Sequence, residues 1–234
     1  MRCFCLILAG LISLGCASAA TDAAVGYKLG FTSAAARQRF GVETPVWGRL
    51  RATMQVQPDG EISAARFSRV FVEAEVAFTM GRRLDVPLED PADLLAYVET
   101  VHPALELPDW RFPAGVEPGV AAILADGVGA HRFVLGPGRD PREVALEKAA
   151  VILERDGEVM GRGRTSDALG SPWRALLWLS HVLLEEGRAL EPGEVVLTGA
   201  LGPVQALAPE SAAGRYRARV EGLGSVAVTI TTVP

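Results

Sequence analysis

Cysteine and histidine are scarce in this 234-residue sequence, which contains three of each. The three cysteines, Cys3, Cys5 and Cys16, all fall within residues 1–19. A chain that begins after Ala19 therefore has no cysteine, which excludes disulfides, thiol catalysis and cysteine-ligated metal from it. The histidines have neither the HxH nor the HExxH spacing, and this disfavours a histidine-ligated zinc site.

The sequence also lacks a stripe of basic residues. Its 23 lysine and arginine residues are dispersed among 28 aspartate and glutamate residues, and the formal net charge is −5. Proteins that bind nucleic acid neutralise phosphates with clustered basic side chains, so we expect no nucleic-acid partner. No G-x-S-x-G motif, P-loop or dinucleotide-binding fingerprint occurs either.

The N-terminal segment has the layout of a secretory signal peptide. A basic second residue precedes the apolar run Phe4–Leu14, and a small-x-small cleavage site ends at Ala19. The run has about eleven residues, whereas a spanning helix needs roughly 20. We predict that residues 1–19 are a signal peptide cleaved near Ala19, and that the protein is secreted or periplasmic with no membrane attachment. A lipid anchor at Cys16 ranks lower, because Ser13 is a poor fit three positions before it.

We predict that residues 20–234 form a single domain, because no linker-like run divides them. Glycine (25) and proline (15) together stay below the share of roughly 25–30% that is typical of low-complexity chains. Short apolar segments bounded by turn signals indicate strands, and Asp156-Gly157 is typical of a hairpin turn. The expected strands span residues 50–57, 70–80, 104–108, 131–136, 147–155, 195–198, 216–220 and 225–232.

Two helices are expected among these strands. One is short and spans residues 91–98, with Asp90 as its N-cap. The clearer one spans residues 172–186, where Ser171 can cap the first turn and Gly187 suits the position after the last. Its broad apolar face indicates a helix buried against a sheet. Many strands with few helices favour an α+β, β-rich fold with an antiparallel or mixed sheet.

Acidic side chains interrupt the apolar segment Val70–Phe78. In a strand, Glu73 and Glu75 point to the same face, where two like charges among apolar neighbours repel and lose hydration. Glu106 is a third lone carboxylate in an apolar run, and three such oxygen donors suit Mg²⁺ or Mn²⁺. The alternative is that Glu73 and Glu75 face solvent on an edge strand. Spacing alone does not show that the three acids converge.

Lys28 lies in the segment Gly26–Ser33, where glycines on both sides let the backbone approach a ligand closely. A lysine in this position could hold an anionic substrate or move a proton. The alternative is an exposed surface lysine.

Several motifs, taken in order, resemble those of the 2-keto-4-pentenoate hydratases. These enzymes and the related oxalocrotonate decarboxylases belong to the fumarylacetoacetate hydrolase superfamily. The similarity extends from about residue 25 to the end of the chain. The motifs that carry it are Gly26–Ser33, Val72–Phe78, Pro103–Leu107, Leu169–Pro172, Gly193–Pro203 and Gly222–Val226.

The resemblance implies a mixed β-sandwich roll of the fumarylacetoacetate hydrolase C-terminal type with one long packed helix. It also implies a Mg²⁺ or Mn²⁺ ion and a small-molecule 2-oxo acid substrate, and we expect a homo-oligomer. The implied roles are metal binding for Glu73, Glu75 and Glu106, catalysis for Lys28 and Asp126, and substrate binding for Thr198 and Gly199.

The activity that the resemblance implies is hydration of a 2-hydroxydienoate (2-oxo-4-enoate) to a 4-hydroxy-2-oxo acid. A 2-oxo acid decarboxylase or a C–C bond hydrolase on the same metal site is an alternative. The hydrolases use a histidine–acid pair, and no histidine occurs between Lys28 and Glu99. A further alternative is a secreted 2-oxo-acid-binding protein without turnover, because Gly127 and Gly129 replace polar residues of the hydratases.

Overall fold

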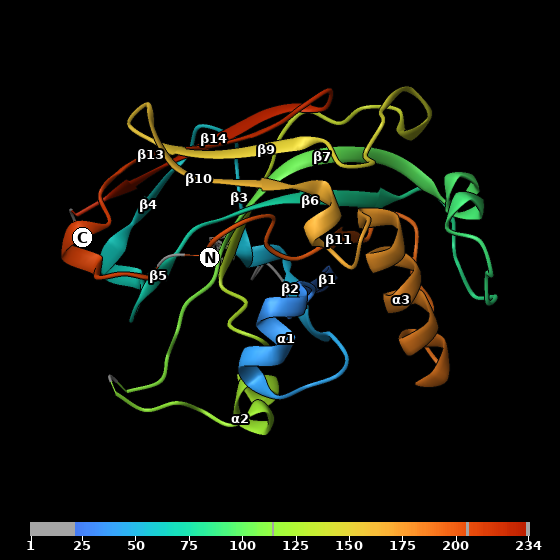
Figure 1. The fold of residues 1–234 in the computed structure, drawn as a ribbon, viewed down its shortest axis with the longest axis horizontal. Helices are drawn as coiled ribbons and strands as arrows, with labels where there is room; N and C mark the ends of the chain where they lie inside the picture. Colours follow the sequence, from blue (N-terminus) through green and yellow to red (C-terminus); the bar gives the residue numbers. More distant parts are fainter. Residues whose placement is uncertain (1–21, 114, 205, 233–234) are drawn as a thin grey trace, which may run out of the picture.

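Two facing β-sheets form the body of the molecule in the computed structural model, which describes residues 22–113, 115–204 and 206–232 (Figure 1). Within these residues, the larger sheet has seven strands in the order β2 (Val46–Arg51), β1 (Ala24–Gly30), β11 (Val195–Leu197), β6 (Glu73–Met80), β7 (Val98–Leu107), β8 (Arg132–Leu135) and β3 (Gln55–Val56). The smaller sheet has five, in the order β10 (Glu158–Arg164), β9 (Ala150–Arg155), β13 (Gly214–Val220), β14 (Gly224–Thr231) and β4 (Glu61–Ser63). A short ribbon pairs β12 (Ala206–Leu207) with β5 (Val70–Phe71).

Both sheets are mixed. In the larger one β1 runs parallel to β11 and β3 runs parallel to β8, and in the smaller one β14 runs parallel to β4. The other pairs, including β6 with β7, are antiparallel. The predicted α+β, β-rich fold class is therefore confirmed.

Helices are few and short except for one. The described residues contain α1 (Ala34–Phe40), α2 (Val120–Ala125), α3 (Pro172–Glu185) and the 3₁₀ turns η1 (Ala52–Met54), η2 (Ala64–Arg66), η3 (Pro91–Ala96), η4 (Pro141–Glu143), η5 (Thr165–Asp167) and η6 (Pro209–Ser211). In Figure 1, α1 and α2 lie on the side of the larger sheet that faces away from the smaller one. None of the helices within the described ranges is long and apolar enough to cross a membrane.

The core lies between the two sheets. Strands β13 and β14 of the smaller sheet pack over β6 and β7 of the larger one. Tyr216 and Phe78, from opposite sheets, are both fully buried there. The helix α3 closes one side of this core, and its Trp173 ring lies 4.6 Å from that of Phe78.

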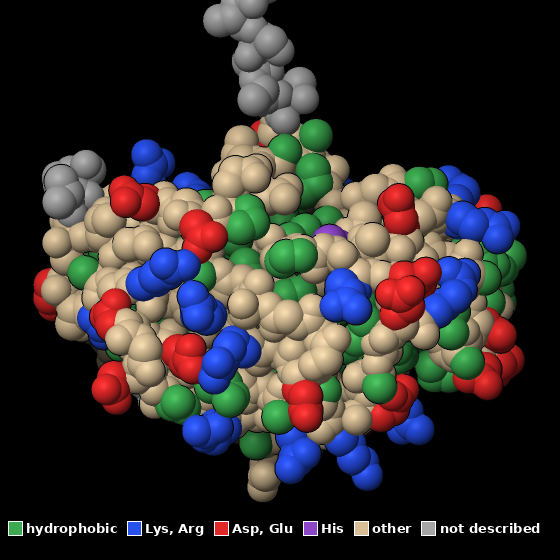
Figure 2. Space-filling model, turned by 90° about the horizontal axis from the view of Figure 1, so that it is seen from above, with side chains coloured by type: hydrophobic (Ala, Val, Ile, Leu, Met, Phe, Trp, Pro, Cys, Tyr) green, Lys and Arg blue, Asp and Glu red, His purple; other side chains and the backbone are tan. Residues whose placement is uncertain are grey.

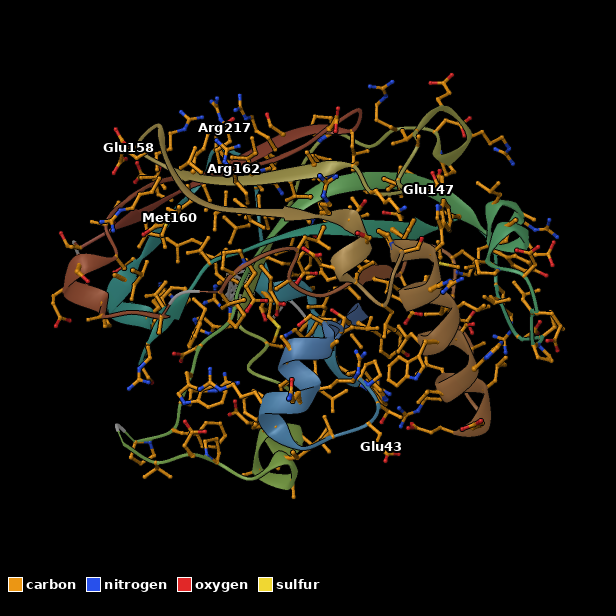
Figure 3. The ribbon with its side chains drawn as sticks, viewed as in Figure 1. Glu43, Glu147, Glu158, Met160, Arg162 and Arg217 are labelled. Carbon is orange, nitrogen blue, oxygen red and sulfur yellow. The ribbon has the colours of Figure 1, made fainter. Side chains whose placement is uncertain are left out.

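The outer face of the smaller sheet is polar. Along β13 buried and exposed side chains alternate, so that Arg217 points outward (Figure 3) while Tyr216 and Ala218 point into the core. Arg162 on β10 lies on the same outer side. Basic and acidic side chains are interspersed, not gathered by sign, over the face shown in Figure 2.

The helix predicted at residues 172–186 is confirmed as α3. The Ser171 hydroxyl accepts a hydrogen bond from the Trp173 backbone N–H at 3.3 Å, and Gly187 follows the helix with φ 71°. Asp90 also caps its segment as predicted, but the segment is the 3₁₀ turn η3 and ends at Ala96.

Two predicted strands are interrupted. The segment 50–57 ends one strand at Arg51, passes through η1, and resumes as β3 at the opposite edge of the larger sheet. The segment 70–80 divides at Val72 into β5 and β6, because β5 pairs with β12 instead of continuing along β7. The signal peptide predicted at residues 1–19 and the cysteines within it lie outside the described residues.

Candidate metal centre

Alternation along β6 separates the core from the candidate site. Val76 and Phe78 point into the core between the sheets. Glu75 therefore points to the opposite face together with Glu73, on the side of α1 and α2. Glu75 is fully buried on that face and Glu73 is partly exposed. The edge-strand alternative is excluded, since β6 lies between β11 and β7 in the interior of the sheet.

The register of β7 adds the third acid. Glu106 lies directly opposite Glu73 in the antiparallel β6–β7 pair, and its side chain is fully buried. Directly opposed side chains start only about 5 Å apart at Cβ. One carboxylate oxygen from each of Glu73, Glu75 and Glu106 lies within 4.8 Å of the others. The structure thus brings together the three acids that the sequence singled out.

Lys28 reaches the same cluster from β1. Its neighbours Tyr27 and Leu29 are buried in the core, so Lys28 points to the acidic face. Its Nζ atom lies 3.1 Å from Glu106 Oε2 and donates a hydrogen bond to the Val128 carbonyl at 3.1 Å. At 4% exposure, it is a buried lysine and not a surface one.

The residues that follow β11 fix Glu75 in place. The Gly199 backbone N–H donates to Glu75 Oε2 at 2.8 Å. The fully buried Thr198 donates its hydroxyl proton to the Val76 carbonyl at 2.9 Å. Both donors are therefore used within the protein, where they hold the Glu75 carboxylate and the backbone of β6 in position.

Burial and mutual repulsion shape the electrostatics of the cluster. Burial, with the charge of Glu106, raises the pKa of Glu73 to about 7 against the pull of Lys28. Burial raises the pKa of Glu75 well above its usual value, and it also raises the pKa of Glu106 although Lys28 opposes the shift. Burial alone would lower the pKa of Lys28, but the neighbouring carboxylates outweigh it and the pKa is raised.

The donor set fits a hard divalent cation. The oxygens Glu75 Oε1 and Glu106 Oε1 are buried without a hydrogen-bond partner among the described residues. If all three carboxylates are ionised beside one ammonium, two negative charges are left uncompensated, and this cost is what raises their pKa values. A divalent ion would balance that charge and occupy the free oxygens, and carboxylate oxygens suit Mg²⁺, Mn²⁺ or Ca²⁺.

The structure gives Asp126 a different neighbour. Its carboxylate binds the guanidinium of Arg111, with Nε at 2.8 Å and Nη2 at 3.0 Å. Among the described residues, no hydrogen bond or ion pair joins it to Lys28 or the three acids. The catalytic role of Asp126 stays a prediction. Asp126 instead anchors the start of the loop whose Val128 carbonyl receives the Lys28 hydrogen bond.

That loop also explains two glycines that replace the hydratases' polar residues. Gly127, Val128 and Gly129 have φ of 70°, 59° and 70°, so three consecutive residues adopt the left-handed conformation. Glycine adopts it without steric cost, whereas a β-branched valine rarely does. The two glycines thus allow the backbone turn that presents a carbonyl to Lys28.

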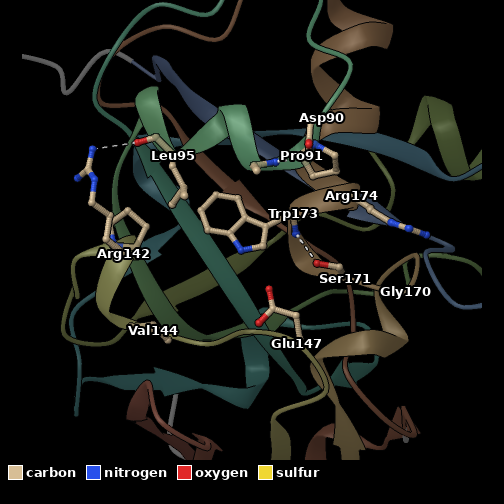
Figure 4. A pocket seen from close by; sticks show the side chains of 12 residues that line it. Asp90, Pro91, Leu95, Arg142, Val144, Glu147, Gly170, Ser171, Trp173 and Arg174 are labelled. Atoms are coloured by element: carbon tan, nitrogen blue, oxygen red, sulfur yellow. Dashed lines mark hydrogen bonds between the residues drawn. The ribbon is translucent and has the colours of Figure 1, made fainter.

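A cavity of about 600 Å³ is linked to the metal centre through the backbone after β11, although neither the three acids nor Lys28 lines it. It is lined in part by Thr32, Arg37 and Ala200, the last of which directly follows Gly199. The sequence motifs did not single out Arg37, because α1 has no buried residue and hence no apolar stripe. A second cavity of similar size, at the N-terminus of α3, is lined by Trp173 (Figure 4) and other residues that do not include the acids or Lys28.

Comparisons with known proteins agree with this geometry. A family model described as the fumarylacetoacetate (FAA) hydrolase C-terminal domain matches residues 19–231. The chain is 40% identical over 205 residues to 2-keto-4-pentenoate hydratase 2 of Dechloromonas aromatica (strain RCB), covering 86% of this chain and 76% of that protein. It is 34% identical over 207 residues to a 4-oxalocrotonate decarboxylase of Pseudomonas sp, covering 88% and 78% respectively.

Solved structures share the fold. The 4-oxalocrotonate decarboxylase from Pseudomonas putida G7, complexed with magnesium and adipate, matches with a TM-score of 0.83 and 27% identity over 90% of this chain and 79% of that one. The fumarylpyruvate hydrolase from Pseudomonas aeruginosa, in complex with Mn²⁺ and pyruvate, has the same fold with a TM-score of 0.70 and 20% identity over 88% and 89%. From its matched length and its identity to these relatives, the chain belongs to the fumarylacetoacetate hydrolase family.

Proposed function

We propose that this protein is a divalent-metal-dependent hydratase, a carbon–oxygen lyase that converts a 2-hydroxydienoate (2-oxo-4-enoate) into a 4-hydroxy-2-oxo acid. One observation carries the proposal: Glu73, Glu75 and Glu106 bring ligand oxygens within 4.8 Å of one another, beside the buried cation of Lys28. The identity to relatives named 2-keto-4-pentenoate hydratase supports the reaction class.

We propose Mg²⁺ or Mn²⁺ as the cofactor. Related folds carry magnesium, calcium or Mn²⁺ in their solved structures, which supports a divalent ion. When bound, such an ion would supply a Lewis acid for the negative charge that develops on the C2 oxygen of a 2-oxo acid. The three carboxylates would hold it, while the Gly199 N–H fixes the orientation of Glu75.

Lys28 is placed to act as a proton or hydrogen-bond donor. In the metal-free protein the carboxylates around it raise its pKa, which favours the ammonium form. An ammonium has three N–H groups, and the Val128 carbonyl and Glu106 Oε2 face two of them. One N–H is left for a substrate oxygen or for proton delivery to the substrate carbon as water adds.

Product analysis tests the proposal. Purified protein with Mg²⁺ or Mn²⁺ should consume 2-hydroxypenta-2,4-dienoate and form the 4-hydroxy-2-oxo acid, followed by dienoate absorbance and by NMR. Glu106→Gln should lower the rate by roughly 100-fold or more, since it removes a charged metal ligand. Glu158→Gln, at the exposed β9–β10 hairpin (Figure 3), is the matched control and should keep the activity. No metal-dependent conversion of any 2-hydroxydienoate would contradict the proposal.

The same assay separates the alternatives on this site. The identity to a 4-oxalocrotonate decarboxylase favours decarboxylation as the second candidate, and release of CO₂ from a 2-oxo diacid without water addition would support it. Cleavage of acylpyruvates would indicate a C–C hydrolase. Metal-dependent binding of oxalate or pyruvate without any turnover would indicate a binding protein.

We also propose that residues 1–19 direct export and that residues 20–234 act as one catalytic domain in a homo-oligomer. N-terminal sequencing of the protein from the producing cell should give a chain that starts near Ala20, after cleavage at the small residues that end at Ala19. Light scattering on the purified chain should give a multiple of the monomer mass. An uncleaved cytoplasmic monomer would contradict both statements.

A further inference from the structure

The cavity of about 600 Å³ shares a backbone segment, Gly199–Ala200, with the metal centre, although the acids and Lys28 do not line it. Gly199 donates to Glu75, and Ala200, the next residue, lines the cavity. Thr32 lines the cavity too and packs so closely on Gly199 that a Cβ there would lie 2.3 Å from the threonine hydroxyl. The cavity volume of about 600 Å³ falls within the range of small-molecule sites. A substrate held at the metal by one end would extend its other end into this space.

Arg37 is the single basic residue among the described residues that line this cavity. Its Nη1 atom donates to the carbonyl oxygens of Phe31 and Thr32 at 3.1 and 2.7 Å, which pins the side chain against the turn before α1. No carboxylate of the described residues lies within ion-pair distance of its guanidinium. Other arginines, such as Arg39, Arg51 and Arg83, form ion pairs with aspartate or glutamate. Within the described residues, Nε and Nη2 thus carry N–H donors that bind no protein acceptor.

The other charged residue in the lining is Asp167. Its Oδ2 atom accepts the backbone N–H of Arg164 at 2.9 Å, so this carboxylate caps η5. No ion pair joins Asp167 to Arg37 within the described residues. The lining therefore contains a guanidinium that is held by two carbonyls and pairs with no described carboxylate, together with the carboxylate of Asp167. Carboxylates are the groups that a guanidinium fork binds best.

We propose that Arg37 selects substrates that carry a second carboxylate at the end remote from the 2-oxo acid group, over substrates of the same length with an apolar tail. The proposal rests on the proposed function, because the metal centre must hold the 2-oxo acid end. Arg37 does not touch the reacting atoms. It contributes binding that is equal in the ground and transition states, which lowers KM and leaves kcat nearly unchanged.

The test is a binding measurement with two inert acids that differ only at the remote end. Calorimetry with the Mg²⁺-loaded protein compares 2-oxoadipate, which ends in a carboxylate, with 2-oxohexanoate, which ends in a methyl group. The protein should bind 2-oxoadipate roughly 10- to 100-fold more tightly, the contribution expected of a charge-assisted hydrogen bond. Arg37→Gln should abolish this preference and leave the affinity for 2-oxohexanoate within about 3-fold.

Arg39→Gln is the matched control, because Arg39 is on the same helix, is exposed, and pairs with Glu117 at 3.5 Å outside the cavity. It should keep the preference. If Arg37 only held the turn at Phe31 and Thr32, its replacement would weaken the binding of both acids to the same extent. The ratio of the two affinities does not depend on what fraction of the variant is misfolded. Equal affinities in the unmodified protein, or a preference that survives Arg37→Gln, would overturn the proposal.

The outcomes also separate this proposal from the proposed function. Turnover of dienoates with no preference for a remote carboxylate would refute only the role of Arg37. Selective binding of 2-oxoadipate without turnover of any dienoate would support Arg37 and refute the hydratase. If neither acid binds with metal present, the role of Arg37 fails, and the dienoate assay by itself decides the hydratase.

Discussion

At the scale of single residues, the candidate centre depends on an imbalance of buried charge. Glu73, Glu75 and Glu106 face Lys28, and their carboxylate oxygens are only partly satisfied by protein donors. The sequence could predict the acids, because a lone carboxylate in an alternating apolar strand is costly unless something compensates it. It could not predict the Val128 carbonyl or Arg37, because their positions depend on turns with left-handed residues that leave no periodic pattern.

Replacing Lys28 tests that charge balance. Lys28→Met removes the cation beside Glu106, and loss of one partner of a buried ion pair costs about 3–5 kcal/mol. The metal-free variant should therefore melt well below the unmodified protein, and Mn²⁺ should raise its melting temperature by more than it raises that of the unmodified protein. Its hydratase rate should fall at least roughly 100-fold. Lys148→Met, at an exposed position, should change neither property.

If Mn²⁺ stabilised Lys28→Met less than the unmodified protein, the account would be contradicted. Lys28 would then help the protein to bind the metal, and would not compensate the carboxylate charge in its place.

His131 gives a pH dependence that is independent of the metal centre. Its ring packs edge-on against Phe67 at 4.6 Å. Burial, with the charge of Arg132, lowers the pKa of His131 to about 4, although Asp109 opposes the shift. The folded state therefore resists protonation that the unfolded chain accepts near pH 6.5. The stability contribution is fully present above pH 6.5 and is lost as the pH falls towards 4.

Urea unfolding at pH 7 and at pH 4.5 measures how much the free energy of unfolding falls between the two pH values. This fall should be smaller for His131→Gln than for the unmodified protein, by roughly 1–3 kcal/mol. Equal losses in the two proteins would show that the histidine is already free to take up a proton in the folded state.

At the scale of elements, the centre depends on the pairing of β1 with β11. Gly26 lies opposite Val195 in this parallel pair, and a Cβ at Gly26 would lie 1.9 Å from the Val195 carbonyl oxygen. The pair positions Lys28 against the acids of β6. Local patterns predicted α3 from its caps and its apolar face, but not α1, whose residues are never fully buried, and not the division of residues 50–57 between two sheet edges.

Gly26→Ala should therefore separate β1 from β11 and lower the free energy of unfolding by roughly 3 kcal/mol or more, because the backbone of Val195 cannot yield as a flexible side chain would. Gly119→Ala is the control, since a Cβ there meets nothing within 4 Å and Gly119 has no positive φ. It should change stability by less than about 1 kcal/mol. Urea titrations of the two variants measure the difference, and similar midpoints would contradict the role assigned to this pair.

At the scale of the whole molecule, the two faces of the larger sheet have different roles. The faces that meet between them form the apolar core, and the opposite face of the larger sheet carries the acids and Lys28. Strand patterns predict a β-rich fold, but they do not specify which strands pair. The contact between β1 and β11 joins segments about 170 residues apart, so it follows from packing of the whole chain and from no local signal.

The central claim is that Glu73, Glu75 and Glu106 share one divalent ion. The most direct measurement is a titration of metal-free protein with Mn²⁺, read by calorimetry and by elemental analysis after desalting, for the unmodified chain and for Glu106→Ala. We predict about one ion per chain, with the affinity of Glu106→Ala lower by at least roughly 10- to 100-fold. Stoichiometric binding that survives Glu106→Ala unchanged, or an unmodified chain that binds no Mn²⁺, would contradict the account.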